Sequence, residues 1–326
     1  MTGAITHRVV EANGIHLHIA EQGEGPLVVL CHGFPESWYS WRHQLAALSA
    51  AGFRAVAPDM RGYGRSDRPD AVEQYTLLHL VGDMVGLVDA LGVDLAVIAG
   101  HDWGAPVAWH AALLRPDRFR AVIGLSVPFI RRGLVPPTSR MPRSDDATFY
   151  QLYFQKPGVA EAELERDVRT SIAKLIFSAS GDVPRRGTGG SGGQVGMVPH
   201  QGGFLSRMAS PSVLPAWLTE ADLDFYVAEF ERTGLTGGLN RYRNVDRDWE
   251  DFGAFTHTPI RVPSLFIGGQ YDGPTVWGAR AIARFDETLP NLWGSFLIDG
   301  CGHWVQQERA EEVNRHLIDF LAAVGR

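Results

Sequence analysis

The pentapeptide Gly100-His101-Asp102-Trp103-Gly104 constrains this chain more than any other feature. It follows the apolar run Leu95–Ala99 and precedes the helix-like segment Ala105–Trp109. A strand, a tight turn with glycine two residues either side of its centre, and a helix form the layout of a nucleophile elbow. Glycines are needed there because larger side chains would collide with the neighbouring strand and helix. The pattern predicts a strand-turn-helix unit that presents Asp102. The competing interpretation is a helix N-cap aspartate between two chance glycines.

An aspartate at the centre of such a turn restricts the chemistry. A carboxylate with a reference pKa of ~3.9 is already ionised at neutral pH, and the N-terminus of the following helix favours the anion. Attack on an ester or amide would give a reactive anhydride, whereas attack on a saturated carbon with a leaving group gives an ordinary ester. The expected electrophile is therefore an alkyl carbon, as in an epoxide or an alkyl halide.

Strand-like and helix-like segments alternate along most of the chain. The predicted strands are Ile15–Ala20, Leu27–Cys31, Ala55–Pro58, Leu95–Ala99, Ala121–Val127, Ser264–Gly268 and Ser295–Ile298, and the predicted helices are Trp38–Ala50, Leu77–Leu91, Ala105–Leu114, Val276–Phe285 and Arg309–Val324. This alternation predicts an α/β fold with a doubly wound, mostly parallel sheet.

The alternation is interrupted between about Phe129 and Asp246, where helices such as Glu161–Phe177 and Glu220–Thr233 are joined by loops. We expect residues 1–130 and 246–326 to form the core, and residues 131–245 to form a helical cap over the carboxyl ends of the strands. Within it, the glycine-rich stretch Gly181–Gly203 is expected to be a surface loop, and whether it gates the site is left open.

Composition excludes several classes of partner. The chain has 326 residues, of which 45% are hydrophobic and 21% charged, and its net charge is −7. The acidic balance argues against nucleic acid and anionic membrane surfaces as partners. No secretory apolar region or membrane-spanning run is evident, so we expect a cytoplasmic protein. A homodimer is left open.

Cysteines and histidines give no sign of a disulfide or a metal. Cys31 and Cys301 are far apart in sequence and are expected to be free buried thiols. The twelve histidines show no metal-ligand spacing. We therefore expect no metal and no cofactor.

An ester on Asp102 must be hydrolysed, which requires a general base and an orienting acid. His303 follows the predicted strand Ser295–Ile298 in a glycine-rich setting, where the base belongs. Asp272 ends the strand Ser264–Gly268 and gives the chain order nucleophile, acid, histidine. Its alternative role is that of an Asp-Gly turn residue.

Backbone N–H groups are needed to stabilise the oxyanion that forms during hydrolysis. The expected donors are the N–H groups of Trp103 and Phe34. His32 precedes Phe34 in the same loop and is interpreted as a brace for that loop rather than as a second catalyst.

Six blocks of sequence resemble a known family: HGFPESWYSWRHQ, DMRGYGRSD, GHDWG, YQLYFQKPGVAEAEL, GLNRYRN and GHWVQQE. Together they are similar to the soluble epoxide hydrolases of the α/β-hydrolase superfamily, especially bacterial members, over nearly the whole chain. The resemblance implies an α/β-hydrolase fold, conversion of epoxides to diols, and two cap tyrosines that hydrogen-bond the epoxide oxygen.

The two tyrosines that the resemblance implies fall on Tyr150 and Tyr242. Ring opening leaves an alkoxide, and a phenol with a reference pKa of ~10 can donate to it without ionising at rest. Tyr153 is the rival for the first position and is interpreted as a packing residue. Many relatives carry tryptophan where this chain has Arg241, which puts the pocket shape in doubt. The expected substrate pocket is apolar and suits a hydrophobic epoxide; its residues are Phe34, Trp38, Trp103, Phe149, Gln151, Phe154 and Trp304.

Three other functions compete with this interpretation. Haloalkane dehalogenases share the aspartate nucleophile and the GHDWG motif, but they usually place asparagine where this chain has Phe34 and do not need the tyrosine pair. A non-catalytic receptor of the same fold should lose part of the Asp102, Asp272 and His303 set. A serine esterase is a weaker alternative still, because Asp102 and not a serine stands at the centre of the predicted elbow.

Overall fold

The computed structural model describes residues 4–184 and 196–325. Within them, an eight-stranded sheet has the order β1-β2-β4-β3-β5-β6-β9-β10. Its strands are β1 (Thr6–Ala12), β2 (Ile15–Gln22), β3 (Leu27–Cys31), β4 (Arg54–Pro58), β5 (Ala96–His101), β6 (Phe119–Leu125), β9 (Ser264–Gly269) and β10 (Leu292–Ile298). β2 pairs antiparallel with β1 and β4, and the remaining neighbours run parallel. The expected doubly wound α/β fold is confirmed.

The central strands are almost entirely buried and mostly apolar, apart from the half-buried Arg120 in β6 and His101 at the end of β5, as expected for strands covered on both faces. Their register aligns Cys31 with Gly100, Gly100 with Gly124, and Gly124 with Phe266. The loops that follow β3, β5, β6 and β9 therefore leave the sheet at the same edge. Side chains from four distant parts of the sequence can meet there.

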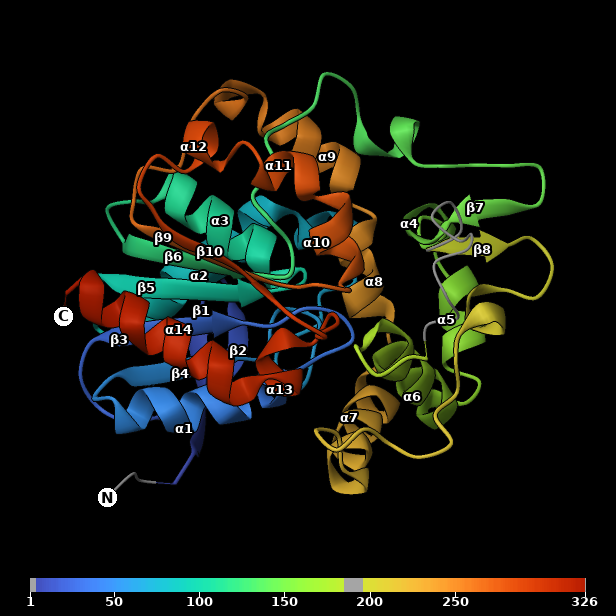
Figure 1. Cartoon of the computed structure of the whole chain (residues 1–326), viewed down its shortest axis with the longest axis horizontal. Coiled ribbons are helices and arrows are strands. Elements are labelled where there is room, and N and C mark those ends of the chain that lie inside the picture. The colour runs from blue at the N-terminus through green and yellow to red at the C-terminus, as the bar shows by residue number, and fades with distance from the viewer. Residues whose placement is uncertain (1–3, 185–195, 326) are drawn as a thin grey trace.

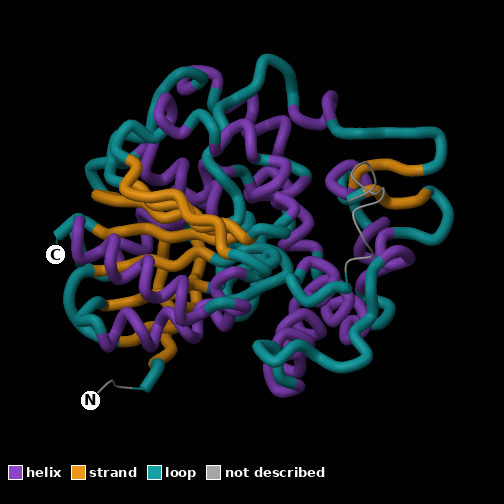
Figure 2. Tube along the Cα trace, viewed as in Figure 1, coloured by secondary structure: helices purple, strands orange, loops and turns teal. Residues whose placement is uncertain are grey.

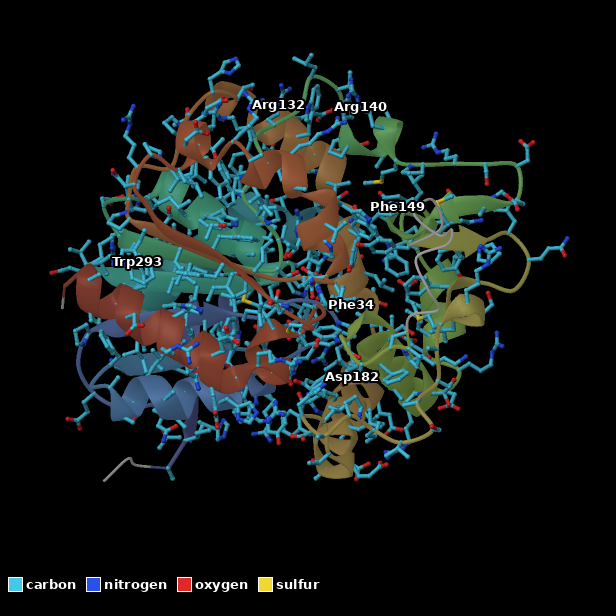
Figure 3. All side chains as sticks on the ribbon, in the orientation of Figure 1. Phe34, Arg132, Arg140, Phe149, Asp182 and Trp293 are labelled. Carbon is cyan, nitrogen blue, oxygen red and sulfur yellow. The ribbon has the colours of Figure 1, made fainter. Side chains whose placement is uncertain are left out.

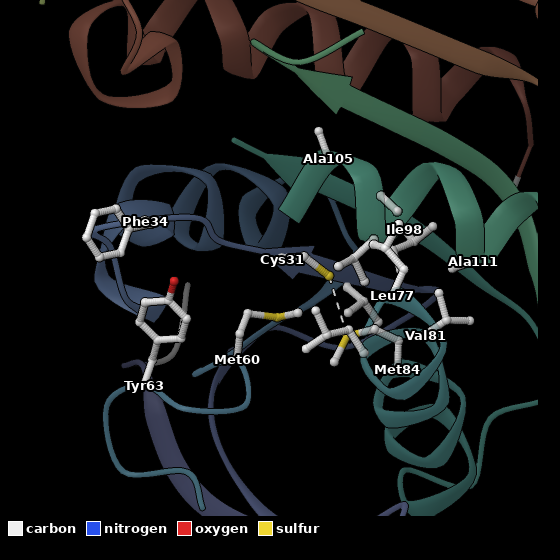
Figure 4. Close-up of a cluster of buried hydrophobic side chains, with 14 of the residues drawn as sticks. Cys31, Phe34, Met60, Tyr63, Leu77, Val81, Met84, Ile98, Ala105 and Ala111 are labelled. Atoms are coloured by element: carbon white, nitrogen blue, oxygen red, sulfur yellow. Dashed lines mark hydrogen bonds between the residues drawn. The ribbon is translucent and has the colours of Figure 1, made fainter. Parts of the chain in front are cut away.

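Helices cover both faces of the sheet (Figure 1). One face carries α1 (Arg42–Ala50), α13 (Val305–Glu308) and α14 (Ala310–Ala323), and the other carries α2 (Leu77–Ala90) and α3 (Gly104–Leu114). Figure 4 shows part of the core on the α2 side, where the Cys31 thiol lies 3.4 Å from the Met84 sulfur. Both cysteines are buried and free, as expected.

The segment between β6 and β9 departs from the regular alternation. It contains η3 (Pro137–Arg140), β7 (Ala147–Phe149), α4 (Tyr150–Tyr153), α5 (Val159–Leu164), α6 (Val168–Ala179), β8 (Met197–Pro199), η4 (Phe204–Arg207), α7 (Glu220–Thr233), α8 (Thr236–Tyr242), α9 (Val245–Asp251) and η5 (Gly253–Phe255). In Figures 1 and 2, α4 to α7 lie beside the sheet rather than on either face. β7 and β8 form a small antiparallel sheet that the sequence did not predict.

Several predicted boundaries are wrong. The helix predicted over Glu161–Phe177 is divided into α5 and α6, because the Asp167 side chain accepts a hydrogen bond from the Thr170 amide and starts a second helix. The helix predicted over Val276–Phe285 is replaced by α10 (Gly273–Trp277), α11 (Ala279–Ile282) and α12 (Phe285–Thr288). Strand β1 and the short helix η2 (Val72–Tyr75) were not predicted at all. The start of the helix predicted over Trp38–Ala50 is a separate short helix, η1 (Trp38–Trp41).

Two further expectations concern loops and membranes. The centre of the glycine-rich stretch Gly181–Gly203 lies outside the described residues, which omit 185–195. In the part of the chain that is described, no helix combines the length and the apolar character that crossing a bilayer requires.

Candidate active site

Asp102 occupies the turn between β5 and α3 with a φ of +49°, a left-handed conformation that few non-glycine residues adopt. The turn is this tight because the chain reverses from a buried strand directly into a buried helix. A Cβ atom at Gly100 would overlap the backbone of Gly104, and one at Gly104 would overlap the backbone of Cys31. The turn therefore has the nucleophile-elbow geometry that its sequence predicts.

Asp272 and His303 lie together beside this turn. Asp272 follows β9 and caps the N-terminus of α10 through the Thr275 amide. His303 Nδ1 lies 2.7 Å from Asp272 Oδ1, and His303 Nε2 lies 3.5 Å from Asp102 Oδ2. All three side chains are mostly or fully buried. The structure thus brings the three predicted residues together, with the imidazole of His303 between the carboxylates of Asp102 and Asp272.

Two hydroxyl groups fix the second oxygen of Asp272. Ser126 Oγ donates to Oδ2 at 2.7 Å, and Thr275 Oγ1 lies 2.6 Å from the same atom. Ser126 Oγ also lies 3.1 Å from His303 Nδ1. These contacts leave Oδ1 of Asp272 for the imidazole and hold its N–H in one orientation.

The charges at the site favour an ionised Asp102. Burial disfavours the carboxylate, but the hydrogen bond and positive charge of His303 outweigh burial and lower the pKa of Asp102. Burial likewise disfavours the imidazolium, but the charge of Asp272 and the contacts with Asp102 raise the pKa of His303 well above its usual value. A carboxylate that is ionised and held beside a cation is available as a nucleophile without a base.

Asp102→Asn is expected to lower the pKa of His303, because it removes one of the two carboxylates that favour the imidazolium. The imidazole NMR signals of His303, followed through a pH titration of both proteins, measure this change. His316 serves as the internal control: burial lowers its pKa without any contribution from Asp102, so its titration should be the same in both proteins. An unchanged pKa of His303 would show that Asp102 does not contribute to it.

The loop after β3 reaches the nucleophile with a backbone donor. The Phe34 N–H donates to Asp102 Oδ1 at 2.8 Å. Glu36 organises this loop: its Oε2 accepts from the Gly33 N–H and from His101 Nδ1, each at 2.8 Å. Burial opposes ionisation of Glu36, but the positive charge of His101 lowers the pKa of that carboxyl. Phe34 therefore lies where an oxyanion donor is expected.

His32 supports the same loop rather than facing Asp102. Its Nε2 accepts from the Met60 amide at 2.9 Å, and its Nδ1 lies 2.9 Å from the Gly33 carbonyl oxygen. Both ring nitrogens are thus engaged by backbone groups. This agrees with its interpretation as a brace.

Tyr150 and Tyr242 meet above the elbow although they lie far apart in the sequence. Their ring centroids are 5.9 Å apart, and the Tyr150 hydroxyl accepts from Gln151 Nε2 at 3.1 Å. Burial and then the charge of Asp102 raise the pKa of Tyr242 well above its usual value, against a hydrogen bond from the Trp103 side chain. Burial also raises the pKa of Tyr150. Both phenols are neutral donors at ordinary pH.

Tyr153, the rival of Tyr150, points elsewhere. Its hydroxyl donates to Glu163 Oε2 at 2.6 Å, and its ring is not among the rings that contact Tyr242 in the described residues.

Most of the predicted pocket residues gather around the tyrosine pair. Phe34 and Phe154 contact Tyr242 edge-on, with ring centroids 5.7 and 5.0 Å from that of Tyr242. The ring centroids of Phe149 and Tyr150 are 4.7 Å apart. Figure 3 shows Phe34 where the sheet-bearing part meets the segment between β6 and β9. The side chains that surround the two tyrosines are therefore mainly aromatic, as expected for an apolar pocket.

Trp38 and Trp304 are exceptions to the predicted pocket. Trp38 packs against His7 and Phe225 in the cluster on the α1 side of the sheet. Trp304 is buried under His303, and its indole donates to the Ile176 carbonyl oxygen at 2.7 Å. A tryptophan next to a motif can face either side of its loop, and the sequence does not reveal which. The structure places both side chains outside the aromatic group around Tyr150 and Tyr242.

Sequence reasoning missed Ser126, Thr275, Glu36 and His101 as parts of the site. Ser126, Glu36 and His101 contact residues that are distant in sequence, so no local pattern marks them, whereas Thr275 contacts Asp272 only three residues before it. The only available signal was position, because all four lie beside or within the motifs that end β3, β5, β6 and β9. No cluster of metal-ligating side chains occurs in residues 4–184 and 196–325.

Comparison with known proteins decides the family. Residues 26–310 match the family model described as alpha/beta hydrolase fold. The chain is 46% identical over 326 residues to the protein named epoxide hydrolase A of Mycobacterium tuberculosis, covering 99% of both chains. The chain belongs to the epoxide hydrolase family of the α/β-hydrolase fold. The family resemblance drawn from its motifs is confirmed.

Other members share the whole structure. Epoxide hydrolase 1 of Siraitia grosvenorii is 42% identical over 325 residues, covering 97% of this chain and 98% of the relative. A solved structure of an epoxide hydrolase from an endophytic Streptomyces is 52% identical and superimposes with a TM-score of 0.93, covering 98% of this chain and 96% of the other. The likeness therefore includes both the sheet and the segment between β6 and β9.

Proposed function

We propose that this protein converts hydrophobic epoxides to vicinal diols through a covalent ester on Asp102. One observation carries the proposal beyond family membership: an ionised carboxylate on a nucleophile elbow acts electrostatically on two phenols in ring contact, the buried Tyr242 and the half-buried Tyr150. The carboxylate can attack an epoxide carbon while the phenols donate to the epoxide oxygen. Neither group requires a cofactor for this step.

In the first step, an Asp102 oxygen forms a bond to the epoxide carbon as the carbon–oxygen bond of the ring breaks. The electron pair of that bond goes to the ring oxygen, which receives a proton supplied through Tyr150 or Tyr242. Positioned acid catalysis of this kind contributes ~10²–10⁴-fold. The phenols suit this role because burial keeps them protonated until charge develops.

In the second step, His303 takes a proton from a water that attacks the carboxyl carbon of the ester. The Phe34 and Trp103 N–H groups stabilise the resulting oxyanion. As this intermediate collapses, the bond between the carboxyl carbon and the alkyl oxygen breaks, and the imidazolium returns its proton to that oxygen. The second proton of the water restores the tyrosine, so the diol leaves and Asp102 is again a carboxylate. Esterification removes the negative charge of Asp102, which contributes to the raised pKa of His303. The pKa of His303 therefore falls when the ester forms, and the imidazole becomes a neutral base when it is needed.

We further propose that residues 131–245 act as a cap and residues 1–130 and 246–326 as the core. The core then supplies Asp102, Asp272 and His303, while the cap supplies both tyrosines. Phe34 and the tyrosine pair favour epoxides over alkyl halides, because a departing halide is not an alkoxide that must be protonated.

A single turnover in oxygen-18 water should place the label in the Asp102 side chain, because water attacks the carboxyl carbon rather than the substrate. Mass spectrometry of the peptide that contains Asp102 measures the incorporation. The same peptide from enzyme kept in labelled water without substrate is the control. Label that enters only the diol, with none in Asp102 after repeated turnovers, would rule out the covalent ester.

A further inference from the structure

Arg241 is a buried cation directly behind the site. It has 3% of its surface exposed and precedes Tyr242 at the end of α8. Its guanidinium pairs with the buried Asp248 and donates to the Tyr75 carbonyl oxygen at 2.8 Å. Asp248 in turn accepts from the Leu77 amide at 2.7 Å. The cation is therefore fixed from two sides, and burying it is tolerated because it is paired.

The face of this guanidinium lies over the Trp103 indole. Arg241 Cζ is 4.7 Å from the ring centroid, within the range of a cation–π contact, which strengthens when both partners are desolvated. Trp103 and Arg241 also line one small cavity together with Tyr63, whose ring lies beside Phe34 in Figure 4.

The Trp103 indole also contacts the ring of Tyr242. The two rings meet edge-on, with centroids 5.0 Å apart and planes at 87°. Arg241 and Tyr242 are consecutive on α8, so their side chains leave the helix about 100° apart, and the indole is held between them. Trp103 also follows Asp102 directly in sequence. Because the indole contacts the Tyr242 ring, movement of the indole would displace the Tyr242 phenol.

We propose that Arg241, anchored by Asp248, is a positioning residue that holds the Trp103 indole against Tyr242 and so directs the Tyr242 hydroxyl at the epoxide oxygen. This inference rests on the proposed function. Proton donation requires heavy atoms within about 2.6–3.2 Å, and small misplacements of a donor slow a reaction strongly. Arg241 therefore acts on ring opening and not on hydrolysis of the ester.

The test separates these two steps by rapid quench with styrene oxide. Arg241→Met alone would leave Asp248 buried and unpaired, so the variant used is Arg241→Met with Asp248→Asn, whose amide oxygen can still accept from Leu77. Ester formation should slow about tenfold, because losing a buried cation–π contact raises the barrier by roughly the energy of that contact. Ester hydrolysis should keep the parental rate.

A second ion pair, outside the cavity that Arg241 lines, provides the control. Arg54 and Glu21 are partly buried and form an ion pair at 2.7 Å between β4 and β2, so Arg54→Met with Glu21→Gln should leave both rates unchanged. Added to Tyr242→Phe, the Arg241 and Asp248 changes should cause no further loss of the ester-formation rate. An unchanged rate of ester formation, an equal loss in both steps, or full additivity with Tyr242→Phe would overturn the proposal. Failure of the parental enzyme to form any ester would instead refute the proposed function.

Discussion

Replacing His303 by glutamine should leave the enzyme trapped as an ester on Asp102. Glutamine retains hydrogen-bonding capacity but cannot take a proton from water, and loss of a general base costs ~10²–10⁴-fold. Ester formation does not need the base, because Asp102 attacks as a carboxylate. Since His303 lowers the pKa of Asp102 in the parental enzyme, the variant is mixed with substrate at mildly alkaline pH to keep Asp102 ionised. Mass spectrometry of the intact protein after mixing with substrate should show a mass increase equal to that of the epoxide.

The same experiment has a matched control and a clear contrary outcome. His110→Gln changes another histidine, whose ring contacts the Pro106 carbonyl within α3, and should accumulate no ester. In the parental enzyme, hydrolysis should decline as the pH falls through the pKa of His303 in the ester, whereas ester formation should change little. A folded His303→Gln protein that binds epoxide yet remains unmodified would show that the histidine is needed for the first step.

Removing both phenols should nearly abolish ring opening. Each single variant, Tyr150→Phe or Tyr242→Phe, should slow ester formation strongly but retain activity, because one donor remains. The double variant should lose most of the ~10²–10⁴-fold that positioned acid catalysis provides. Rapid-quench measurement of ester formation in the three variants gives these values.

Tyr153→Phe is the matched control for the tyrosine variants. It removes a hydroxyl that is hydrogen-bonded to Glu163 within the same short stretch of sequence and should leave ester formation at the parental rate. Parental rates in both Tyr150→Phe and Tyr242→Phe would reduce the pair to packing residues. The preference for epoxides over halides would then lose its main physical support.

The parts of the fold that were predictable are those with strong local signals. The buried strands around Leu30, Ile98 and Ile123 are continuous apolar runs, and the glycines around Asp102 specify the elbow. Strand β1 gave no such signal, because it lies at the edge of the sheet and five of its seven residues, Thr6 to Val9 and Glu11, are exposed. Its pairing with β2 is a tertiary event that its own pattern does not encode.

The candidate site divides in the same way. Asp102, Asp272 and His303 follow strands, so topology alone brings them together. Tyr150 and Tyr242 required the family resemblance, because they lie in helices whose position depends on packing. Ser126 follows a strand but has no carboxyl group, so the search for an acid does not single it out, yet its hydroxyl orients Asp272. Its role depends on the neighbour that it meets, which a single sequence does not give.

The two tyrosines are held by different supports. Tyr150 begins α4, and its amide bonds to the Gly196 carbonyl oxygen beside β8. Tyr242 ends α8, which packs on η2 from the sheet-bearing part. The residues that hydrolyse the ester lie at the ends of strands. The two phenols that activate the substrate are supported differently: Tyr242 by a helix packed on the sheet-bearing part, and Tyr150 by the peripheral sheet of β7 and β8. Evolution can therefore alter the peripheral support, and with it the range of epoxides accepted, without disturbing the machinery that completes each turnover.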